Sequence, residues 1–319
     1  MSKHYAVISV GTNSTRVLLA DVEPEIPHVD LARSIGTRIG EGLGQSGELG
    51  EEPMRRTYDA MRQLLRAVRG HYVRLFAVAT SAVRRATNRA VFEAGVKDVL
   101  GVALRTLDGE EEAAASYRGA ITAFGALHGE RVGVVDTGGG STEYAIGFGH
   151  APERLVSCEI GAVRLTEAVP ELAGRDGVVD LATIERARAI ARQALLPIRD
   201  FASVERLAFV GGSATTTAAI VRGRRGKIAS YSMTRAELQK VLVRLCGMTL
   251  RERKEVAGMK AQRADILPGG IIVLDTVLDL VKRDGAVATA ADLLLGFLLQ
   301  QRDGTPAARQ HPHSEVPTH

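Results

Sequence analysis

Three short glycine-containing segments carry residue types that bind phosphate, and each follows an apolar, β-rich run. Glycine lets a backbone approach an anion closely, and consecutive N–H groups beside hydroxyls form an anion nest. One such segment alone is typical of an ordinary tight turn, whereas three that meet would hold a chain of phosphates. None fits the G-x-x-x-x-G-K-[ST] signature of a P-loop, and no G-x-S-x-G elbow is present. The segments are Gly11-Thr12-Asn13-Ser14, Gly138-Gly139-Gly140-Ser141 and Gly211-Gly212-Ser213.

Three consecutive glutamates, Glu110, Glu111 and Glu112, open an Ala-rich helical stretch. Such a run often does no more than complement the dipole of the helix. Here it follows a predicted strand at residues 103–107, and active sites of α/β folds gather at the carboxyl ends of strands. Crowded carboxylates raise at least one pKa, which suits a general base that activates water.

Two arginines, Arg84 and Arg85, lie at a second predicted strand-to-helix junction, in residues 79–88. The fork of a guanidinium matches two phosphate oxygens, so either arginine could hold a phosphate by a bidentate contact. A solvated basic face is the alternative interpretation. The segment therefore predicts a phosphate ligand without deciding between the two side chains.

Two hairpins that would position these residues repeat along the chain. Residues 6–20 and 132–146 each consist of a β-rich run, a small-residue turn and a second β-rich run. Gly138 and Ser141 lie 127 positions after Gly11 and Ser14, so the register is constant. A repeat at this distance indicates one duplicated domain.

Outside the hairpins, helical spacing alternates with the strands predicted at residues 75–80 and 207–210. This order predicts two α/β domains with mixed sheets, at residues 1–125 and 126–302, with the helix at about 290–302 packing back on the first. Residues 303–319 are polar, contain three prolines and are predicted to be a disordered tail. Helices are predicted at residues 51–69, 110–124, 181–201, 235–246, 250–256, 267–283 and 290–302.

The composition is that of an ordinary globular chain, with 319 residues of which 45% are hydrophobic and 24% charged. The two cysteines, Cys158 and Cys246, are far apart, which argues against a disulfide framework or a cysteine zinc site. We find no signal peptide, and no apolar run approaches the ~20 residues needed to cross a bilayer. These features predict a cytoplasmic protein with no membrane partner.

Taken together, these segments resemble the exopolyphosphatase/guanosine-pentaphosphate phosphohydrolase (Ppx/GppA) family, short two-domain type, of the actin–hexokinase–sugar kinase superfamily. The resemblance covers roughly residues 5–300 and includes residues 38–43, 47–49, 161–165 and 263–267. It implies two actin-like (ribonuclease H-like) α/β domains with mixed sheets around an interdomain cleft. It also implies an exopolyphosphatase that releases orthophosphate from the end of inorganic polyphosphate.

The resemblance further implies roles for individual residues. Glu112 would be the base that activates water, Glu111 would tune it, and Arg84 would bind the scissile phosphate. Asp136 and Glu143 would hold Mg²⁺ or another divalent cation. The phosphate chain would lie on a set of nests formed by Gly11, Thr12, Asn13, Ser14, Arg16, Gly138, Gly139, Gly140, Ser141, Thr142, Gly211, Gly212 and Ser213.

Two positions depart from the family pattern. The family usually carries Asp where this chain has Ser9, the position equivalent to Asp136 in the repeat. A hydroxyl there would reach a cation through water, because Mg²⁺ keeps several of its waters. The second departure is Asp292-Leu293-Leu294-Leu295-Gly296, where the family usually has a glycine and an Arg-Glu pair before the last glycine.

Other functions stay open at this stage. The chain could hydrolyse guanosine alarmones such as pppGpp, sense phosphate chains or alarmones without turnover, or act as a kinase of the same superfamily. Two basic clusters could lead a long phosphate chain out of the cleft, or could be solvated faces that bind nucleic acid only non-specifically. A homodimer is implied by the resemblance alone. The clusters are Arg222, Arg224, Arg225 and Lys227, and Arg251, Arg253, Lys254, Lys260 and Arg263.

Overall fold

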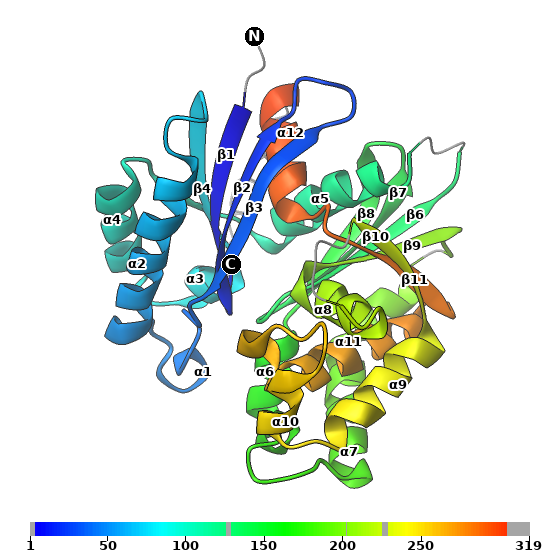
Figure 1. Cartoon of the computed structure of the whole chain (residues 1–319). Coiled ribbons are helices and arrows are strands. Elements are labelled where there is room, and N and C mark those ends of the chain that lie inside the picture. Colours follow the sequence, from blue (N-terminus) through cyan, green and yellow to red (C-terminus); the bar gives the residue numbers. More distant parts are fainter. Residues whose placement is uncertain (1–3, 126–128, 202, 225–228, 305–319) are drawn as a thin grey trace, which may run out of the picture.

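The computed structural model describes residues 4–125, 129–201, 203–224 and 229–304, which form two mixed β-sheets flanked by helices (Figure 1). The strands of the first sheet lie in the order β3-β2-β1-β4-β5 and those of the second in the order β10-β11-β9-β6-β7-β8. The first sheet contains β1 (His4–Val10), β2 (Ser14–Asp21), β3 (His28–Gly36), β4 (Arg74–Ala79) and β5 (Leu104–Thr106). The second contains β6 (Val132–Thr137), β7 (Thr142–Phe148), β8 (Ala151–Cys158), β9 (Arg206–Val210), β10 (Ser230–Thr234) and β11 (Gly285–Thr289).

The duplication predicted from the sequence is present in the hairpins. In each hairpin the first glycine of the turn donates its N–H to the carbonyl of the serine three residues later, at 3.0 Å for both Gly11–Ser14 and Gly138–Ser141. Each first strand also pairs in parallel with the strand that follows the next helical segment, β1 with β4 and β6 with β9. The five strands of the first sheet therefore have counterparts in the second, which carries one additional antiparallel edge strand, β10. This is the α/β architecture with mixed sheets that the sequence predicted.

Each hairpin is extended by a third antiparallel strand that the sequence pattern did not indicate. β3 pairs with β2, and β8 pairs with β7. Along β3 most side chains are exposed or half-buried, because it is an edge strand with water on one side. An edge strand lacks the continuous apolar run of a central strand, so its signal in the sequence is weak.

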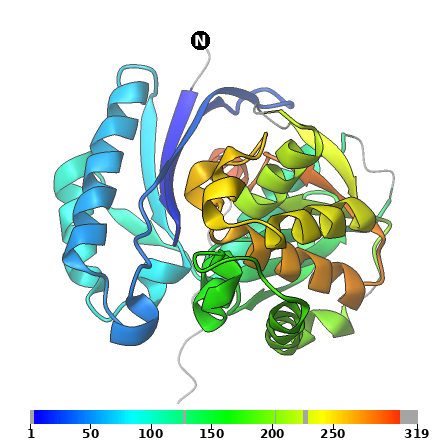
Figure 2. The same cartoon turned by 60° about the horizontal axis from the view of Figure 1, so that its bottom comes forward.

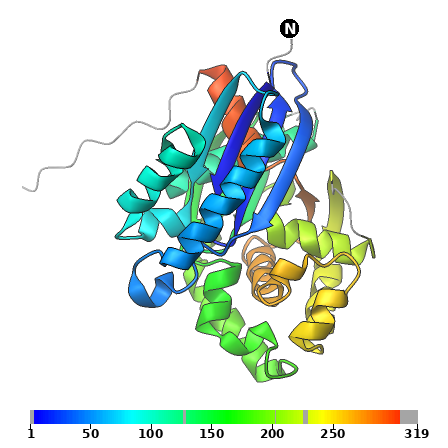
Figure 3. The same ribbon diagram turned by 60° about the vertical axis from the view of Figure 1, so that its left-hand side comes forward.

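Helices cover the outer faces of the two sheets, as the turned views show (Figures 2 and 3). On the first sheet, α2 buries Met61, Leu64 and Val68 in a core that includes Ile8 and Phe92. On the second sheet, α11 lies at the centre of the largest core and is buried along nearly its whole length. The helices are α1 (Leu43–Ser46), α2 (Glu51–Val68), α3 (Ser81–Arg85), α4 (Arg89–Leu100), α5 (Gly109–Ala120), α6 (Ala162–Ala168), α7 (Leu181–Ala194), α8 (Gly211–Val221), α9 (Arg235–Cys246), α10 (Leu250–Glu255), α11 (Leu267–Leu280) and α12 (Leu293–Asp303).

Two helices, α5 and α12, each pack against the sheet formed by the other half of the chain. α12 packs against β1 and β2, where Leu294 and Leu298 bury their side chains beside Val7 and Leu18. α5, which follows the first sheet in the chain, packs against β6, β7 and β8 of the second. The two helices approach closely where they cross, at Gly119 of α5. A Cβ atom at this position would collide with the carbonyl of Asp292, so the close approach requires glycine. This crossing places the N-terminus of α12 beside α5.

Several helix ends differ from the sequence prediction for local reasons. The helix predicted at residues 181–201 ends at Ala194 and continues as a 3₁₀ turn over Leu196–Asp200, because Pro197 cannot donate an α-helical hydrogen bond. The helix predicted at 290–302 begins after its N-cap Asp292 and ends at Asp303, the first residue of the predicted tail. Residues 305–319 lie outside the described residues. Within the described segments no helix is long and apolar enough to cross a membrane.

Candidate active site

The first two glycine-containing turns meet where the sheets adjoin. A Cβ atom at Gly139 would lie 2.9 Å from Cβ of Thr12, and one at Gly140 would lie 2.7 Å from Oγ of Ser81. Any side chain at these two glycines would displace the opposite turn or the start of α3. The sequence therefore needs glycine here to bring the turns of the β1–β2 and β6–β7 hairpins into contact.

The third turn joins the same place through the start of α8. Gly211 adopts a positive φ of 88°, and a Cβ atom there would lie 2.8 Å from Oδ1 of Asp136. Both the backbone conformation and the space require glycine. Gly212 in turn lies against the guanidinium of Arg263, because a Cβ atom at Gly212 would collide with it. All three segments that the sequence singled out thus lie near one another.

Buried side-chain atoms without a hydrogen-bond partner concentrate in these turns. Within the described residues they include Oδ1 of Asn13 and the hydroxyl oxygens of Ser81, Thr137, Ser213 and Thr216. A buried polar group left unpaired costs about 1–3 kcal/mol, so a group of them calls for a binding partner. Hydroxyl donors beside exposed backbone N–H groups would suit the oxygens of a phosphate.

Other predicted nest residues have partners inside the protein. The hydroxyl of Thr142 donates to the carbonyl of Ile160 at 2.6 Å, and Oγ of Ser14 accepts a hydrogen bond from the side-chain amide of Asn13 at 3.2 Å. Arg16, on β2, forms an ion pair with Asp292, the N-cap of α12. The hydroxyl of Thr142 therefore stabilises the turn. The ion pair of Arg16 brings an acidic residue, Asp292, to a place where the sequence did not predict one.

Glu112 is buried at the start of α5 and forms an ion pair with Arg84 at the end of α3. Arg84 also donates to the carbonyl of Leu107 at 2.9 Å, which fixes its guanidinium. Burial raises the pKa of Glu112 to about 8, and Arg84 opposes that rise. Arg85 lies 3.9 Å from Glu159 and forms no other ion pair within the described residues, so of the two candidate arginines it is Arg84 that contacts the candidate base.

The other glutamates of the run face different surroundings. Glu111 accepts the backbone N–H of Asp108 at 2.9 Å and a hydrogen bond from Arg105 at 2.5 Å, while Asp108 caps the helix in return. One carboxylate oxygen of Glu111 thus completes a capping box, which stabilises the first helical turn, and the other is engaged by Arg105. Glu110 is exposed. The geometry thus separates Glu112, which points into the interior, from its neighbours.

Asp136 and Glu143 lie directly opposite each other on β6 and β7. Residues paired in this way across an antiparallel ladder point to the same face of the sheet. Ser116 of α5 donates to Oδ2 of Asp136 at 2.5 Å, and Ser157 of β8 donates to Oε1 of Glu143 at 2.8 Å. The two carboxylates are therefore held side by side next to the start of α5.

The pKa values of both carboxylates are raised. Burial raises the pKa of Asp136 to about 6, with Asp292 adding to the effect. Burial also raises the pKa of Glu143, and Glu112 and Asp136 raise it further. Carboxylates that repel one another in a buried place bind a cation well, because the cation removes the repulsion.

The carboxylates fit a divalent cation held in part by water and substrate. Among the described residues, no group of three or more His, Cys, Asp or Glu forms a ready metal cage. Mg²⁺ commonly uses one or two carboxylates and completes its shell with water and phosphate oxygens. Asp136 and Glu143 provide such a pair of hard oxygen ligands.

Several residues at the site were not predicted as site residues. Ser116, Ser157 and Glu159 contact the predicted ones, and Glu159 pairs with Arg164 at 2.8 Å as well as with Arg84 at 3.8 Å. Burial and nearby cations lower the pKa of Lys260 to about 8 and that of Arg263 to about 10. The spacing of residues along the chain does not reveal these contacts, since each contact joins elements that are distant in the sequence.

One member of the second basic cluster, Arg253, cannot belong to a surface track, whereas Arg251 and Lys254 are exposed. Arg253 is fully buried and donates to the carbonyls of Leu245, Met248 and Leu172 at 2.7–3.1 Å. It therefore stabilises the loops around α10 and cannot contact a bound chain. In the first cluster, Arg225 and Lys227 lie outside the described residues.

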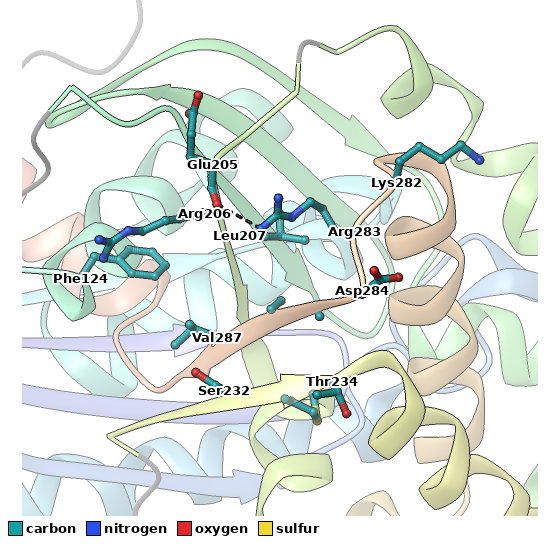
Figure 4. A pocket seen from close by; sticks show the side chains of 13 residues that line it. Phe124, Glu205, Arg206, Leu207, Ser232, Thr234, Lys282, Arg283, Asp284 and Val287 are labelled. Atoms are coloured by element: carbon teal, nitrogen blue, oxygen red, sulfur yellow. Dashed lines mark hydrogen bonds between the residues drawn. The ribbon is translucent and has the colours of Figure 1, made fainter.

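A cavity of about 580 Å³ lies away from the turns, at the opposite ends of the central strands of the second sheet (Figure 4). It is lined by Arg206 at the start of β9 and by residues at the start of β11, with Arg283 donating to the carbonyl of Glu205 at 3.1 Å. None of the predicted site residues lines it. The chemistry collects instead at the carboxyl ends of β6 and β9, as expected for α/β sheets.

The fold and the site define a phosphatase of the actin-like superfamily. The chain belongs to the Ppx/GppA phosphatase family, whose sequence model matches residues 20–292. It is 35% identical over 287 residues to exopolyphosphatase 2 of Mycobacterium tuberculosis, covering 85% of this chain and 88% of that protein. A solved exopolyphosphatase from Cytophaga hutchinsonii superposes with a TM-score of 0.83 at 26% identity, over 95% of this chain and 99% of the other.

A second group of relatives has a different named activity. The guanosine-5′-triphosphate,3′-diphosphate pyrophosphatase of Vibrio vulnificus is 29% identical over 92% of this chain, which spans 58% of that protein. A crystallised Aquifex aeolicus Ppx/GppA protein has a TM-score of 0.77 at 24% identity and shows a common fold. Both sets of relatives act on phosphoanhydride-bearing compounds by their names.

Proposed function

We propose that this protein is an exopolyphosphatase that hydrolyses the terminal phosphoanhydride bond of inorganic polyphosphate. The observation that carries the proposal is the buried contact between Glu112 and Arg84 beside the Asp136–Glu143 pair. It unites a candidate base, a phosphate ligand and cation ligands at the place where three glycine-containing turns meet. Similarity to exopolyphosphatase 2 of M. tuberculosis along most of both chains supports the same reading.

Each group has a part in the reaction. The backbone N–H groups and hydroxyls of the turns would hold the phosphate chain, and Arg84 would bind the terminal phosphate and offset its developing charge. Glu112 would take a proton as a water oxygen bonds to the terminal phosphorus. The bond from that phosphorus to the bridging oxygen breaks, which releases orthophosphate and leaves a chain shorter by one phosphate. A divalent cation at Asp136 and Glu143 would neutralise phosphate charge.

The ion pair between Arg84 and Glu112 affects whether the carboxyl of Glu112 is protonated. Without substrate, Arg84 lowers the proton affinity of Glu112. If Arg84 left Glu112 on binding phosphate, the pKa of Glu112 would rise further and the carboxyl would stay protonated. Arg84 would therefore keep its contact with Glu112 while it binds the phosphate, so that the carboxylate is ionised and can accept the proton.

The halves of the chain are proposed to form two domains, at residues 1–125 and 126–302, with α12 returned to the first sheet. The packing of α12 against β1 and β2 supports this division. Magnesium as the cation and a homodimeric state rest on the family resemblance.

The test is orthophosphate release from long-chain polyphosphate, with Mg²⁺ and with EDTA, beside the same assay on pppGpp. We expect release from polyphosphate that requires the cation and exceeds release from pppGpp. Faster turnover of pppGpp at equal concentration would reassign the protein to alarmone hydrolysis. Binding of either compound without release would identify a sensor.

A further inference from the structure

The two hairpins match in backbone but differ in the side chains that face the site. In the second hairpin, Asp136 and Glu143 are partners across the strands. In the first hairpin the equivalent partners are Ser9 and Arg16. The first half thus has no acidic side chain at this pair of positions, and it has a cation where the second half has a carboxylate.

A carboxylate reaches this position from elsewhere in the chain. Asp292 forms an ion pair with Arg16 although 276 positions separate them. The side chain of Asp292 is only 6% exposed, and its second oxygen, Oδ1, accepts the N–H of Leu294 at 3.1 Å as the N-cap of α12. Since Arg16 is the cross-strand partner of Ser9, its ion pair with Asp292 brings a carboxylate close to the uncharged side chain of Ser9.

The crossing of α5 and α12 sets Asp292 beside Asp136. The carbonyl of Asp292 packs against Gly119, and the glycine leaves no room for a larger residue. One turn earlier on the same face of α5, Ser116 donates to Asp136 at 2.5 Å. The two aspartates therefore approach the same stretch of α5.

Buried unpaired oxygens lie in the turns that close both hairpins. Oδ1 of Asn13 follows β1, and Oγ1 of Thr137 ends β6. Unpaired oxygen atoms of this kind suit ordered waters, which a hydrated cation would bring to the turns.

We propose that Asp292 supplies the carboxylate of the first half at the cation site, in place of a residue at position 9, and that Arg16 holds it ready. The inference rests on the proposed function for its substrate. In the free protein Arg16 occupies Oδ2 of Asp292, and among the described residues no group of three or more His, Cys, Asp or Glu forms a complete cage. On binding, a cation would take Asp292 together with Asp136 and Glu143, and Arg16 would be free to pair with a phosphate oxygen.

The test measures cation affinity directly, through Mn²⁺ titration followed by electron paramagnetic resonance. Asp292→Asn keeps a good N-cap and the shape of the side chain while removing the charge. We expect a Kd for Mn²⁺ at least ~10-fold higher than in wild type, equivalent to about 1.4 kcal/mol. Asp303→Asn, which removes a carboxylate at the other end of α12, is the matched control and should leave the Kd unchanged.

Adding Ser9→Asp to Asp292→Asn gives a second, independent readout. A carboxylate at position 9 would face Arg16 across the ladder, so we expect Mn²⁺ affinity to recover to within ~3-fold of wild type. If Asp292 serves only as a cap and ion-pair partner, Asp292→Asn will lower the thermal midpoint but leave the Kd unchanged, and Ser9→Asp will restore nothing. That pattern would overturn the inference.

Failure of the inference differs from failure of the proposed function. Wild-type release of orthophosphate from polyphosphate with an unchanged Kd in Asp292→Asn would overturn the role of Asp292 alone. A weakened Kd in a protein that hydrolyses no polyphosphate would support Asp292 as a cation ligand and overturn the proposed substrate. Should Asp292→Asn unfold, Arg16→Gln combined with Asp292→Asn is compared with Arg16→Gln alone, because both variants lack the repulsive guanidinium: an equal Kd for the two would again overturn the inference.

Discussion

Arg84 and Glu112 form a buried ion pair between two helices that start at neighbouring strand ends. α3 follows β4 and α5 follows β5, and these strands are adjacent and parallel in the first sheet. The proposed ligand for phosphate and the proposed acceptor for a proton are thereby linked in the free protein. The pair makes the chemistry of the site testable with single substitutions.

Replacement of Glu112 by Gln should lower kcat on polyphosphate by ~10²-fold or more, because an amide cannot accept the proton of the attacking water. Binding of polyphosphate and the fold should persist. Glu111→Gln should cost much less, because glutamine also serves in a capping box. Exposed Glu110→Gln is the control. Ordinary activity in a folded Glu112→Gln protein would remove Glu112 as the base, and a larger loss in Glu111→Gln would transfer the role to Glu111.

The pH profile of kcat/KM should report the raised pKa of Glu112. The ionised carboxylate is the active form, so activity falls as pH decreases through this pKa. We expect the acid limb to inflect well above the ordinary range of a glutamate, towards 8 at limiting Mg²⁺. Saturating Mg²⁺ should lower the inflection, because a nearby cation favours the charged form. An inflection near 4–5 at limiting Mg²⁺ would contradict the burial argument.

Asp136→Asn and Glu143→Gln should each raise the Mg²⁺ concentration for half-maximal activity by ~10-fold or more. Each change removes a charged oxygen ligand while keeping the size of the side chain. The exposed Asp98→Asn in α4 is the control. The measurement is a Mg²⁺ titration of orthophosphate release. Superimposable titrations for wild type and both variants would place the cation elsewhere.

Arg253→Met should destabilise the protein without changing its chemistry. Arg253 donates to the carbonyls of Leu245, Met248 and Leu172. The carbonyl of Leu245 also accepts the N–H of Met248, so methionine would leave two carbonyls, those of Met248 and Leu172, buried and unpaired. At about 1–3 kcal/mol for each unpaired group, we expect a loss of about 2 kcal/mol or more in the free energy of unfolding. Urea denaturation measures the loss, and exposed Arg251→Met is the control. A loss below about 1 kcal/mol would show that water replaces the guanidinium.

Neutralising Arg222 and Arg224 tests the basic cluster that follows α8. If a long chain runs over these residues, Arg222→Gln with Arg224→Gln should reduce kcat/KM for long polyphosphate more than for triphosphate. The difference should shrink as salt rises, because exposed charge contacts are screened. The same double change at two exposed arginines, Arg66 of α2 and Arg69 at its C-cap, is the control. An unchanged ratio of the two substrates at low salt would exclude a track over this cluster.

The sequence by itself determined the repeated hairpins, the turn residues and most helices. These features depend on local patterns, namely apolar periodicity and glycine in tight turns, which neighbouring residues set. The spacing of Gly11 and Gly138 alone indicated the duplication. Family resemblance then assigned roles to Glu112, Arg84, Asp136 and Glu143, and these assignments stay predictions.

The tertiary structure decided which charges share the site. Arg16 and Asp292 meet because α12 leaves the second sheet and packs on the first, and no local pattern encodes a contact across 276 positions. The structure also distinguishes two residues of the same type. Glu111 and Glu112 are adjacent in the sequence, yet a helix turns successive side chains by about 100°, so one caps the helix and the other is buried against Arg84.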